Sequence, residues 1–362
     1  MNKLSIALLY GGRSGEHEVS LRSAASVYKH LDRDKYYIHL IGISKEGIWY
    51  LQPHPGEVAD VLPLEQESQQ VISVVPGKGL SSYKGPIEVD AVLPILHGTF
   101  GEDGTLQGLL EIADLPYAGA DVGGSYLSMD KDITKIIWQH HGLPVVPFRS
   151  VRKAECSADD FSWSTLLTQL KKEFGMPLFV KPSQCGSSVG VSRVDQEEEF
   201  ERAMTEALRY DNKVLVEPAV NAREIECSVL GNENPRTFPP GELQPSHEFY
   251  DYEAKYIDPD GAALIIPADI ERETAEKVKS IAGKAYTVLG CSGMARVDFF
   301  MDKETEELYL NEINTIPGFT SISMFPLLCD AGGLAYPDLL DRMISLAIER
   351  YERKQSLSFS LK

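Results

Sequence analysis

Runs of apolar residues alternate with polar, helix-like segments in the first part of the chain. The runs Ile6–Tyr10, Tyr37–Ile43 and Val89–Leu96 have the length of buried strands. Apolar residues at near-helical spacing lie between Val19 and Leu31, directly after the first run. Because strands that alternate with helices form parallel sheets with crossover connections, this part predicts a Rossmann-like parallel-sheet domain.

The pattern changes after Asp130. Ile133, Ile136 and Ile137 form a helical stripe that stops at Gly142 and Pro144. The segment that follows predicts two helices, Leu166–Phe174 and Glu197–Tyr210, and two strands, Pro177–Val180 and Val189–Val194, which flank a glycine-containing loop.

A third part begins near Lys213–Glu217, which reads as a strand. It contains a long helix over Glu271–Leu289, a terminal helix over Tyr336–Arg353, and a strand pair, Ala295–Phe300 and Leu308–Asn314. We therefore expect an α/β (α+β) chain with three domains, at residues 1–130, 131–212 and 213–362.

Composition and charge narrow the class of protein. Hydrophobic residues make up 43% of the chain and charged residues 25%, as in globular proteins. The formal charge of −19 disfavours nucleic acids and anionic membranes as partners, so any phosphate site must be local. Five scattered cysteines without a CxxC pair, and no signal-like or membrane-spanning apolar stretch, predict a cytoplasmic protein.

The strand pair near the C-terminus carries a polar set typical of a metal site. Side chains alternate faces along a strand, so Arg296 shares a face with Asp298, and Glu312 shares one with Asn314. Mg²⁺ prefers hard oxygen ligands and completes its shell with water and substrate phosphates. A solvated hairpin face is the bland alternative, but Val297, Phe299 and Ile313 occupy the opposite faces, as expected of strands that pack on a core.

Two loops are further candidates for ligand binding. Lys181 precedes Gly186-Ser-Ser-Val-Gly190 between two predicted strands, which favours a lid over a nucleotide because no Walker A pattern opens a helix there. Glu16 follows the first strand in Gly11-Gly-Arg-Ser-Gly-Glu-His-Glu-Val-Ser20, where it could take an ammonium group. The alternatives are an ordinary hairpin turn and an exposed acid in a helix's first turn.

Taken together, these segments resemble D-alanine–D-alanine ligases of the ATP-grasp superfamily over almost the whole chain. The further motifs are Leu96-His-Gly98 with Gly101-Glu-Asp-Gly-Thr-Leu-Gln-Gly108, Met129-Asp-Lys131, Glu248-Phe-Tyr-Asp-Tyr-Glu-Ala-Lys-Tyr256, Ala295-Arg-Val-Asp298 and Asn311-Glu-Ile-Asn-Thr-Ile-Pro-Gly-Phe-Thr320. The resemblance implies an ATP-grasp fold and the ligation of two D-alanine molecules for bacterial cell-wall synthesis, through a D-alanyl phosphate.

The resemblance also implies a role for each matching residue. ATP would contact Lys131, Lys181, Ser188, Glu217, Pro218, Val220, Glu224 and Lys255. Two Mg²⁺ or Mn²⁺ ions would be bound by Asp298, Glu312 and Asn314. The D-alanine site would comprise Glu16, His97, Arg296, Gly318, Ser323 and Met324, with Arg296 and Gly318 as the oxyanion pocket. Ser187 and Tyr256 would join Glu16 in closing the site, and we assign no role to the side chains of Gln184 and Cys185.

Several alternatives remain at this point. A ligase of the same fold could make D-alanyl-D-lactate or D-alanyl-D-serine, although Tyr256 after Lys255 favours D-alanine because lactate-forming relatives carry a different loop there. An oxidoreductase is disfavoured by the absence of G-x-G-x-x-G, and a catalytically idle binding module by the presence of every matching metal ligand and phosphate lysine. The family resemblance suggests a homodimer.

Overall fold

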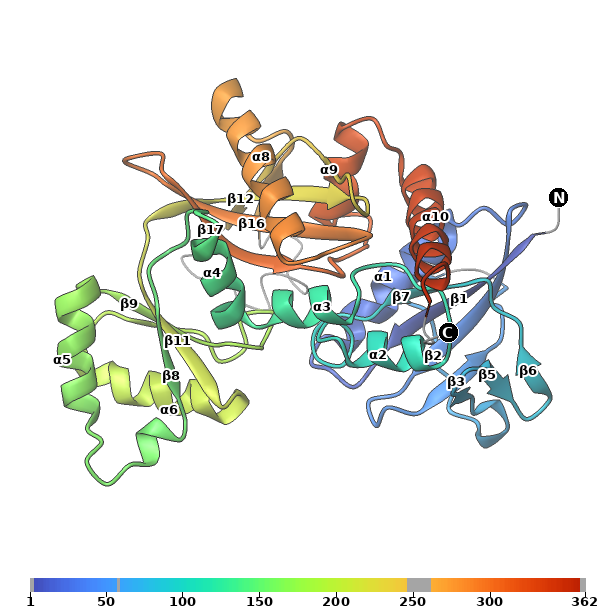
Figure 1. Cartoon of the computed structure of the whole chain (residues 1–362), viewed down its shortest axis with the longest axis horizontal. Coiled ribbons are helices and arrows are strands. Elements are labelled where there is room, and N and C mark those ends of the chain that lie inside the picture. The colour runs from blue at the N-terminus through green and yellow to red at the C-terminus, as the bar shows by residue number, and fades with distance from the viewer. Residues whose placement is uncertain (1–2, 57–58, 246–261, 359–362) are drawn as a thin grey trace.

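The computed structural model describes residues 3–56, 59–245 and 262–358, and Figure 1 shows its three larger sheets as separate parts of the molecule. The N-terminal sheet has the order β3-β2-β1-β7, in which β1 pairs in parallel with β2 and β7 while β3 is antiparallel to β2. Its strands are β1 (Leu4–Gly11), β2 (Tyr36–Ile43), β3 (Trp49–Gln52) and β7 (Ala91–Ile95). The apolar run of β1 is buried on both faces, as expected of an inner parallel strand.

Helices from both ends of the chain cover this sheet. The first helix, α1 (His17–His30), and the last, α10 (Tyr336–Gln355), contact each other and share one hydrophobic core with β1, β2 and β7. The remaining elements of this part are β4 (Ser73–Val75), β5 (Gly79–Ser82), β6 (Gly85–Ile87), η1 (Ser68–Gln70), α2 (Thr105–Ile112) and α3 (Val122–Met129). The C-terminal helices are therefore packed on the N-terminal sheet, which brings distant parts of the sequence together.

The central part is an antiparallel sheet of order β10-β9-β11-β8, packed on two helices through its own apolar core. Its elements are β8 (Arg149–Arg152), η2 (Glu155–Ser157), α5 (Trp163–Phe174), β9 (Leu178–Pro182), β10 (Ser192–Val194), η3 (Glu197–Glu199), α6 (Phe200–Tyr210) and β11 (Lys213–Pro218). The helix that precedes it, α4 (Lys131–His140), packs instead on α8 and on the core of the third sheet. The glycine-rich loop, residues 183–191, joins β9 to β10 at the edge of this sheet.

The third sheet has the order β15-β14-β12-β16-β17, with β13 also paired to β12. One face packs on α8 through apolar side chains that alternate along β12, β16 and β17, as the sequence pattern predicts. The elements are β12 (Ala222–Leu230), β13 (Arg236–Thr237), β14 (Gly241–Pro245), β15 (Ala262–Ile265), α8 (Arg272–Val288), β16 (Met294–Asp302), β17 (Leu308–Asn314) and α9 (Met324–Ala331). The opposite face of this sheet carries the polar residues of the predicted metal site.

Candidate active site

The strands β16 and β17 place the four predicted polar residues of the hairpin side by side. Arg296 pairs across the strands with Asn314, and Asp298 pairs with Glu312. The Arg296 guanidinium binds both carboxylate oxygens of Asp298, at 2.7 Å each, and the Asn314 amide donates to Asp298 at 2.9 Å. The convergence predicted from side-chain alternation is therefore present.

Glu226, on the neighbouring strand β12, belongs to the same cluster. It stands opposite Asp298 in the register and lies 2.9 Å from the Arg296 guanidinium. Burial favours the neutral form of Arg296, but Asp298 and Glu226 outweigh it and raise the pKa of this guanidinium well above its ordinary value. No sequence motif singled out Glu226; the alternation that placed Asp298 on the polar face could have found it.

The oxygen-rich hairpin has the ligand chemistry that Mg²⁺ requires. Within the described ranges no three His, Cys, Asp or Glu side chains are grouped as a metal site. The predicted set instead consists of two carboxylates and one amide oxygen, which matches the few protein ligands that Mg²⁺ combines with phosphate oxygens. In this structure Arg296 and Lys131 balance the charge of these carboxylates.

Lys131 joins the hairpin to the glycine-rich loop. Its ammonium lies 3.2 Å from Glu312 and donates to the backbone carbonyl of Cys185 at 2.9 Å. Lys181 lies in the same region, 2.7 Å from Glu217 and 3.3 Å from the side-chain oxygen of Asn311. Two lysines, the loop and the carboxylate hairpin thus form one site that could neutralise a polyphosphate.

A second network anchors the base of the glycine-rich loop. Asp130 caps α4 and accepts hydrogen bonds from Ser183 at 2.7 Å, from Gln184 at 3.0 Å and from Lys213 at 2.7 and 2.8 Å. Burial alone would raise the pKa of Asp130, but the Lys213, Ser183 and Gln184 hydrogen bonds lower it. The Gln184 side chain, to which the sequence assigned no role, therefore holds the loop beside Lys131.

Glu16 lies where the N-terminal part meets the glycine-rich loop. The Ser187 hydroxyl donates to its carboxylate across 171 residues of sequence. Gly98 adopts φ +73°, which favours glycine, and a Cβ built there would lie 2.2 Å from a Glu16 carboxylate oxygen, so any side chain would force Glu16 to move. Ser187 and Ser188 also have positive φ, of 50° and 59°, a conformation that is uncommon for non-glycine residues.

The His97 imidazole lies beneath this junction. The ring is buried, with Nδ1 2.8 Å from the Ile316 carbonyl and Nε2 3.0 Å from the Ser23 hydroxyl. Burial lowers the pKa of His97, which favours the neutral ring. Both ring nitrogens of His97 therefore have hydrogen-bond partners, and the ring holds the loops around Glu16 in place.

The loop after β17 brings the last predicted residues to the same place. A Cβ built on Gly318 would lie 2.8 Å from the Ser323 hydroxyl, so these two residues are neighbours. Ser323 stands at the start of α9, where its hydroxyl accepts from the Thr320 N–H at 2.9 Å. The Met324 side chain is buried in the core, which leaves only its backbone for contact with a substrate.

The remaining predicted residues fall into two groups. Pro218, Val220 and Glu224 are partly buried near the end of β11 and the start of β12. Lys255 and Tyr256, with the motif Glu248–Tyr256, lie outside the described residues.

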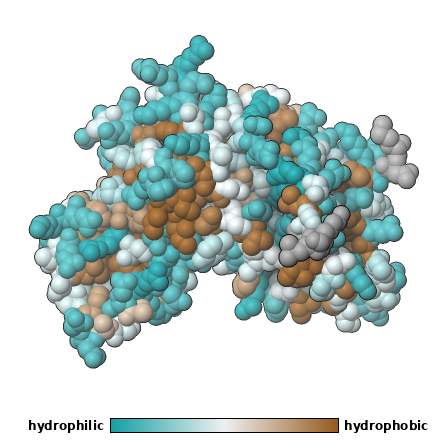
Figure 2. Space-filling view, in the orientation of Figure 1, coloured by the Kyte–Doolittle hydropathy of each residue, from teal (hydrophilic) through white to brown (hydrophobic). Residues whose placement is uncertain are grey.

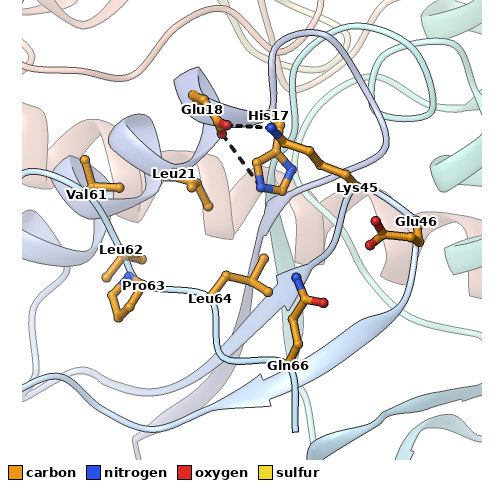
Figure 3. A pocket seen from close by; sticks show the side chains of 10 residues that line it. All are labelled: His17, Glu18, Leu21, Lys45, Glu46, Val61, Leu62, Pro63, Leu64 and Gln66. Carbon is orange, nitrogen blue, oxygen red and sulfur yellow. Dashed lines mark hydrogen bonds and ion pairs between the residues drawn. The ribbon is translucent and has the colours of Figure 1, made fainter. Parts of the chain in front are cut away.

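A surface pocket of about 390 Å³ lies next to the site without belonging to it (Figure 3). Its walls include His17 and Lys45, but none of the predicted site residues. The residues that converge around Lys131 and Glu16, rather than this pocket, form the candidate active site.

Comparison with known proteins identifies the family of the chain. Residues 5–120 match the family model described as the D-ala D-ala ligase N-terminus, and residues 137–345 match the D-ala D-ala ligase C-terminus. A D-alanine–D-alanine ligase from Treponema denticola is 47% identical, with 98% of each chain covered. One from a Thermoanaerobacter species is 48% identical, covering 98% of this chain and 99% of the relative.

Solved structures show the same likeness. The D-alanine-D-alanine ligase from Coxiella burnetii has a TM-score of 0.84 and 38% identity, covering 98% of this chain and 96% of the other. The VanG D-Ala:D-Ser ligase from Enterococcus faecalis has a TM-score of 0.83 and 34% identity, covering 96% and 100%. The predicted ATP-grasp fold and the resemblance read from the motifs are confirmed, and the chain is a ligase that belongs to the D-alanine–D-alanine ligase family.

Proposed function

We propose that the chain joins two D-alanine molecules into D-alanyl-D-alanine, with ATP converted to ADP and phosphate, for peptidoglycan precursor synthesis. The observation that carries the proposal is Lys131, whose ammonium contacts both Glu312 and the carbonyl of Cys185. One cluster therefore contains a cation suited to phosphate, a carboxylate suited to a metal ion, and the glycine-rich loop. The relatives named for D-alanine ligation, at 47% and 48% identity, support the choice of substrate.

The chemistry requires activation of a carboxylate. Transfer of the γ-phosphoryl group of ATP to the carboxylate of the first D-alanine gives D-alanyl phosphate and ADP. The amine of the second D-alanine attacks the carbonyl carbon, phosphate leaves with the C–O bond electrons, and the amine loses a proton. We propose that Lys131 and Lys181 offset the phosphoryl charge, with Ser188, Glu217, Pro218, Val220, Glu224 and Lys255 also at the nucleotide.

We propose roles in substrate binding for residues around the same cluster. Glu16 binds the ammonium of the first D-alanine, and Arg296 with the Gly318 N–H stabilises the oxyanion. The hydroxyl of Ser323 and the backbone of Met324 bind the carboxylate of the second D-alanine. Ser187 and Tyr256 close the loop over Glu16, which keeps water from the acyl phosphate.

We propose that Asp298, Glu312 and Asn314 bind two Mg²⁺ or Mn²⁺ ions. Such ions supply charge neutralisation at the transferred phosphoryl group. The cross-strand pairing of Asp298 with Glu312 and the position of Asn314 beside Asp298 support this set.

Domain boundaries, assembly and location are also proposed. The first boundary lies near 130, whereas we place the second after Pro218 rather than at 212, because β11 pairs with β8 and β9 of the central sheet. The Ile136 side chain, on α4, is 52% exposed, and Figure 2 shows a hydrophobic area in the region of this helix. Exposed apolar surface of this kind supports a homodimer. Five free cysteines support a reducing cytoplasm.

None of the helices in the described parts of the chain is both long and apolar enough to cross a membrane.

The decisive experiment compares acceptor substrates at fixed enzyme concentration. Phosphate release and product mass are measured with ATP plus D-alanine, L-alanine, or D-alanine mixed with D-serine or D-lactate. We expect D-alanyl-D-alanine as the main product in every mixture and no turnover with L-alanine alone. A mixed dipeptide or ester as the main product would instead assign the chain to the D-serine or D-lactate branch.

A further inference from the structure

Lys135 is a buried cation that neither the family resemblance nor the sequence motifs assign. It lies on α4, one turn after Lys131, and its side chain is fully buried. Its ammonium is 2.6 Å from one carboxylate oxygen of Glu217, and the Lys181 ammonium is 2.7 Å from the other. Glu217 is thus held on both sides by cations.

This arrangement carries an electrostatic cost. Burial lowers the pKa of Lys135 to about 8, because a charged ammonium loses its water. Burial alone would raise the pKa of Glu217, but Lys135 and Lys181 hold it below its ordinary value. An apolar side chain could fill the same space without a desolvation penalty, so a requirement for packing does not account for a lysine here.

The shortest polar contact of Lys135 is the one with Glu217. Its side chain has no exposed surface, and its ammonium otherwise lies 3.4 Å from the Val146 carbonyl and 5.6 Å from the centre of the Phe148 ring. Lys181, by contrast, also donates to Asn311, on strand β17 of the hairpin. Without Lys135, Glu217 would pair with Lys181 alone and would be free to move with it.

We propose that Lys135 is a positioning residue of the nucleotide site, which fixes the Glu217 carboxylate as an acceptor for the adenine amino group while Lys181 stays directed at the phosphates. The inference rests on the proposed function, in which Glu217 contacts adenine. A fixed anionic acceptor favours a base with an N–H donor at this edge, as in adenine, over guanine, which presents a carbonyl oxygen there. Lys135 therefore contributes to base selectivity as well as to affinity.

The test measures equilibrium binding of ATP and GTP to the full chain in the absence of D-alanine, by calorimetry. We expect Lys135→Met to weaken ATP binding about tenfold or more and to lower the ATP-to-GTP preference, as expected when a buried charged hydrogen bond is lost. The KM for D-alanine should change less than about twofold. Lys153→Met is the matched control, because Lys153 is an exposed lysine just after β8 of the central sheet, and its ammonium donates to the Leu208 carbonyl.

A double-mutant cycle separates positioning from general stability. If Lys135 acts through Glu217, adding Lys135→Met to Glu217→Gln should change ATP affinity and the ATP-to-GTP preference little further. Additive effects on binding, or a lowered melting temperature with unchanged affinity and preference, would show that Lys135 is only a structural ion-pair partner.

Two further outcomes are distinguishable. If Lys135→Met does not fold, Lys135→Arg replaces it in the test. The longer, planar guanidinium should displace Glu217 and change the ATP-to-GTP preference. An unchanged preference in folded Lys135→Arg would overturn the inference. Failure of the wild-type chain to bind ATP would contradict the proposed function itself. Wild-type binding that none of the Lys135 variants alters would contradict only the role of Lys135.

Discussion

Glu102 accepts a hydrogen bond from the backbone N–H of Ile316 at 3.0 Å, although 214 residues separate the two in sequence. The other Glu102 oxygen accepts from the Gly98 N–H at 2.9 Å, and His97 contacts the Ile316 carbonyl. The turn beside Glu16 and the segment that leads to Gly318 are therefore fixed to each other. Burial, with a smaller effect from Glu16, raises the pKa of Glu102 to about 8. The buried position therefore disfavours the ionised form of this carboxyl.

We expect Glu102→Gln to lower kcat about tenfold while the dissociation constant for ATP stays unchanged. The amide retains one acceptor oxygen, so one of the two backbone N–H groups loses its buried partner. This loss costs about 1–3 kcal/mol. It destabilises the segment that leads to Gly318 and leaves the nucleotide site unchanged. Steady-state kinetics and calorimetry measure the two effects. Glu111→Gln on α2 is the control, since Glu111 pairs with Lys354 and Tyr117 away from the site. An equal loss of ATP binding would contradict the prediction.

We expect Asp298→Asn and Glu312→Gln each to lower kcat at least about 100-fold in a protein that still folds. Both substitutions remove a charge from the polar face of the β16–β17 hairpin, whereas its core face is unaltered. Activity is measured against Mg²⁺ concentration, with Glu304→Gln, in the exposed turn of the same hairpin, as the control. Wild-type activity of either variant at low Mg²⁺ would rule out the metal assignment.

Local pattern was enough to predict much of this architecture. The apolar runs at β1, β2 and β7 and the alternation along β16 and β17 depend on neighbours within a few residues, so the sequence displays them directly. The short strands β4, β5 and β6 were not predicted, because three- and four-residue strands are too short to show a period. The convergence of Arg296 and Asp298 followed from the side-chain alternation alone.

Other parts of the site could not be read from local pattern. Lys135 lies outside the apolar stripe of Ile133, Ile136 and Ile137, and only the fold, which brings α4 to Glu217 at the end of β11, shows that it is buried and paired. Gln184 likewise bonds Asp130 because two segments 54 residues apart meet in the fold. Such pairs depend on tertiary contacts that the spacing of residues does not encode.

We expect Glu242→Gln to reduce the loss of stability that the protein shows on acidification. The Arg223 guanidinium donates to both Glu242 oxygens, at 2.9 and 2.6 Å, and this hydrogen bonding lowers the pKa of the carboxyl below its ordinary 4.5. A lowered folded-state pKa stabilises the protein above pH 4.5, and that contribution, about 1 kcal/mol for a partly exposed pair, is lost as the pH falls through the folded value.

The melting temperature of wild type and variant, measured between pH 7 and pH 3, tests this sign. The variant should melt lower at pH 7, and the difference should shrink as the pH falls. Glu304→Gln is the control, since Glu304 is exposed in the turn between β16 and β17. A difference that stays constant with pH would show that the ionisation of Glu242 does not contribute.

The last prediction concerns the contact between Ser187 and Glu16, which joins the glycine-rich loop to the N-terminal part. Ser187→Ala removes the hydroxyl but keeps the Cβ, so the cost of its left-handed backbone is nearly unchanged and the lost hydrogen bond is isolated. Without this bond the loop should close less often over the acyl phosphate, and water should compete with the second D-alanine. We therefore expect a KM for D-alanine raised by about three- to tenfold, a modest effect consistent with one charged hydrogen bond, and more than one phosphate released per dipeptide. Phosphate and dipeptide are measured in the same samples, with Ser157→Ala, whose exposed hydroxyl bonds the Lys153 carbonyl, as the control. A one-to-one ratio together with a wild-type KM would mean that the Ser187 contact only packs the loop.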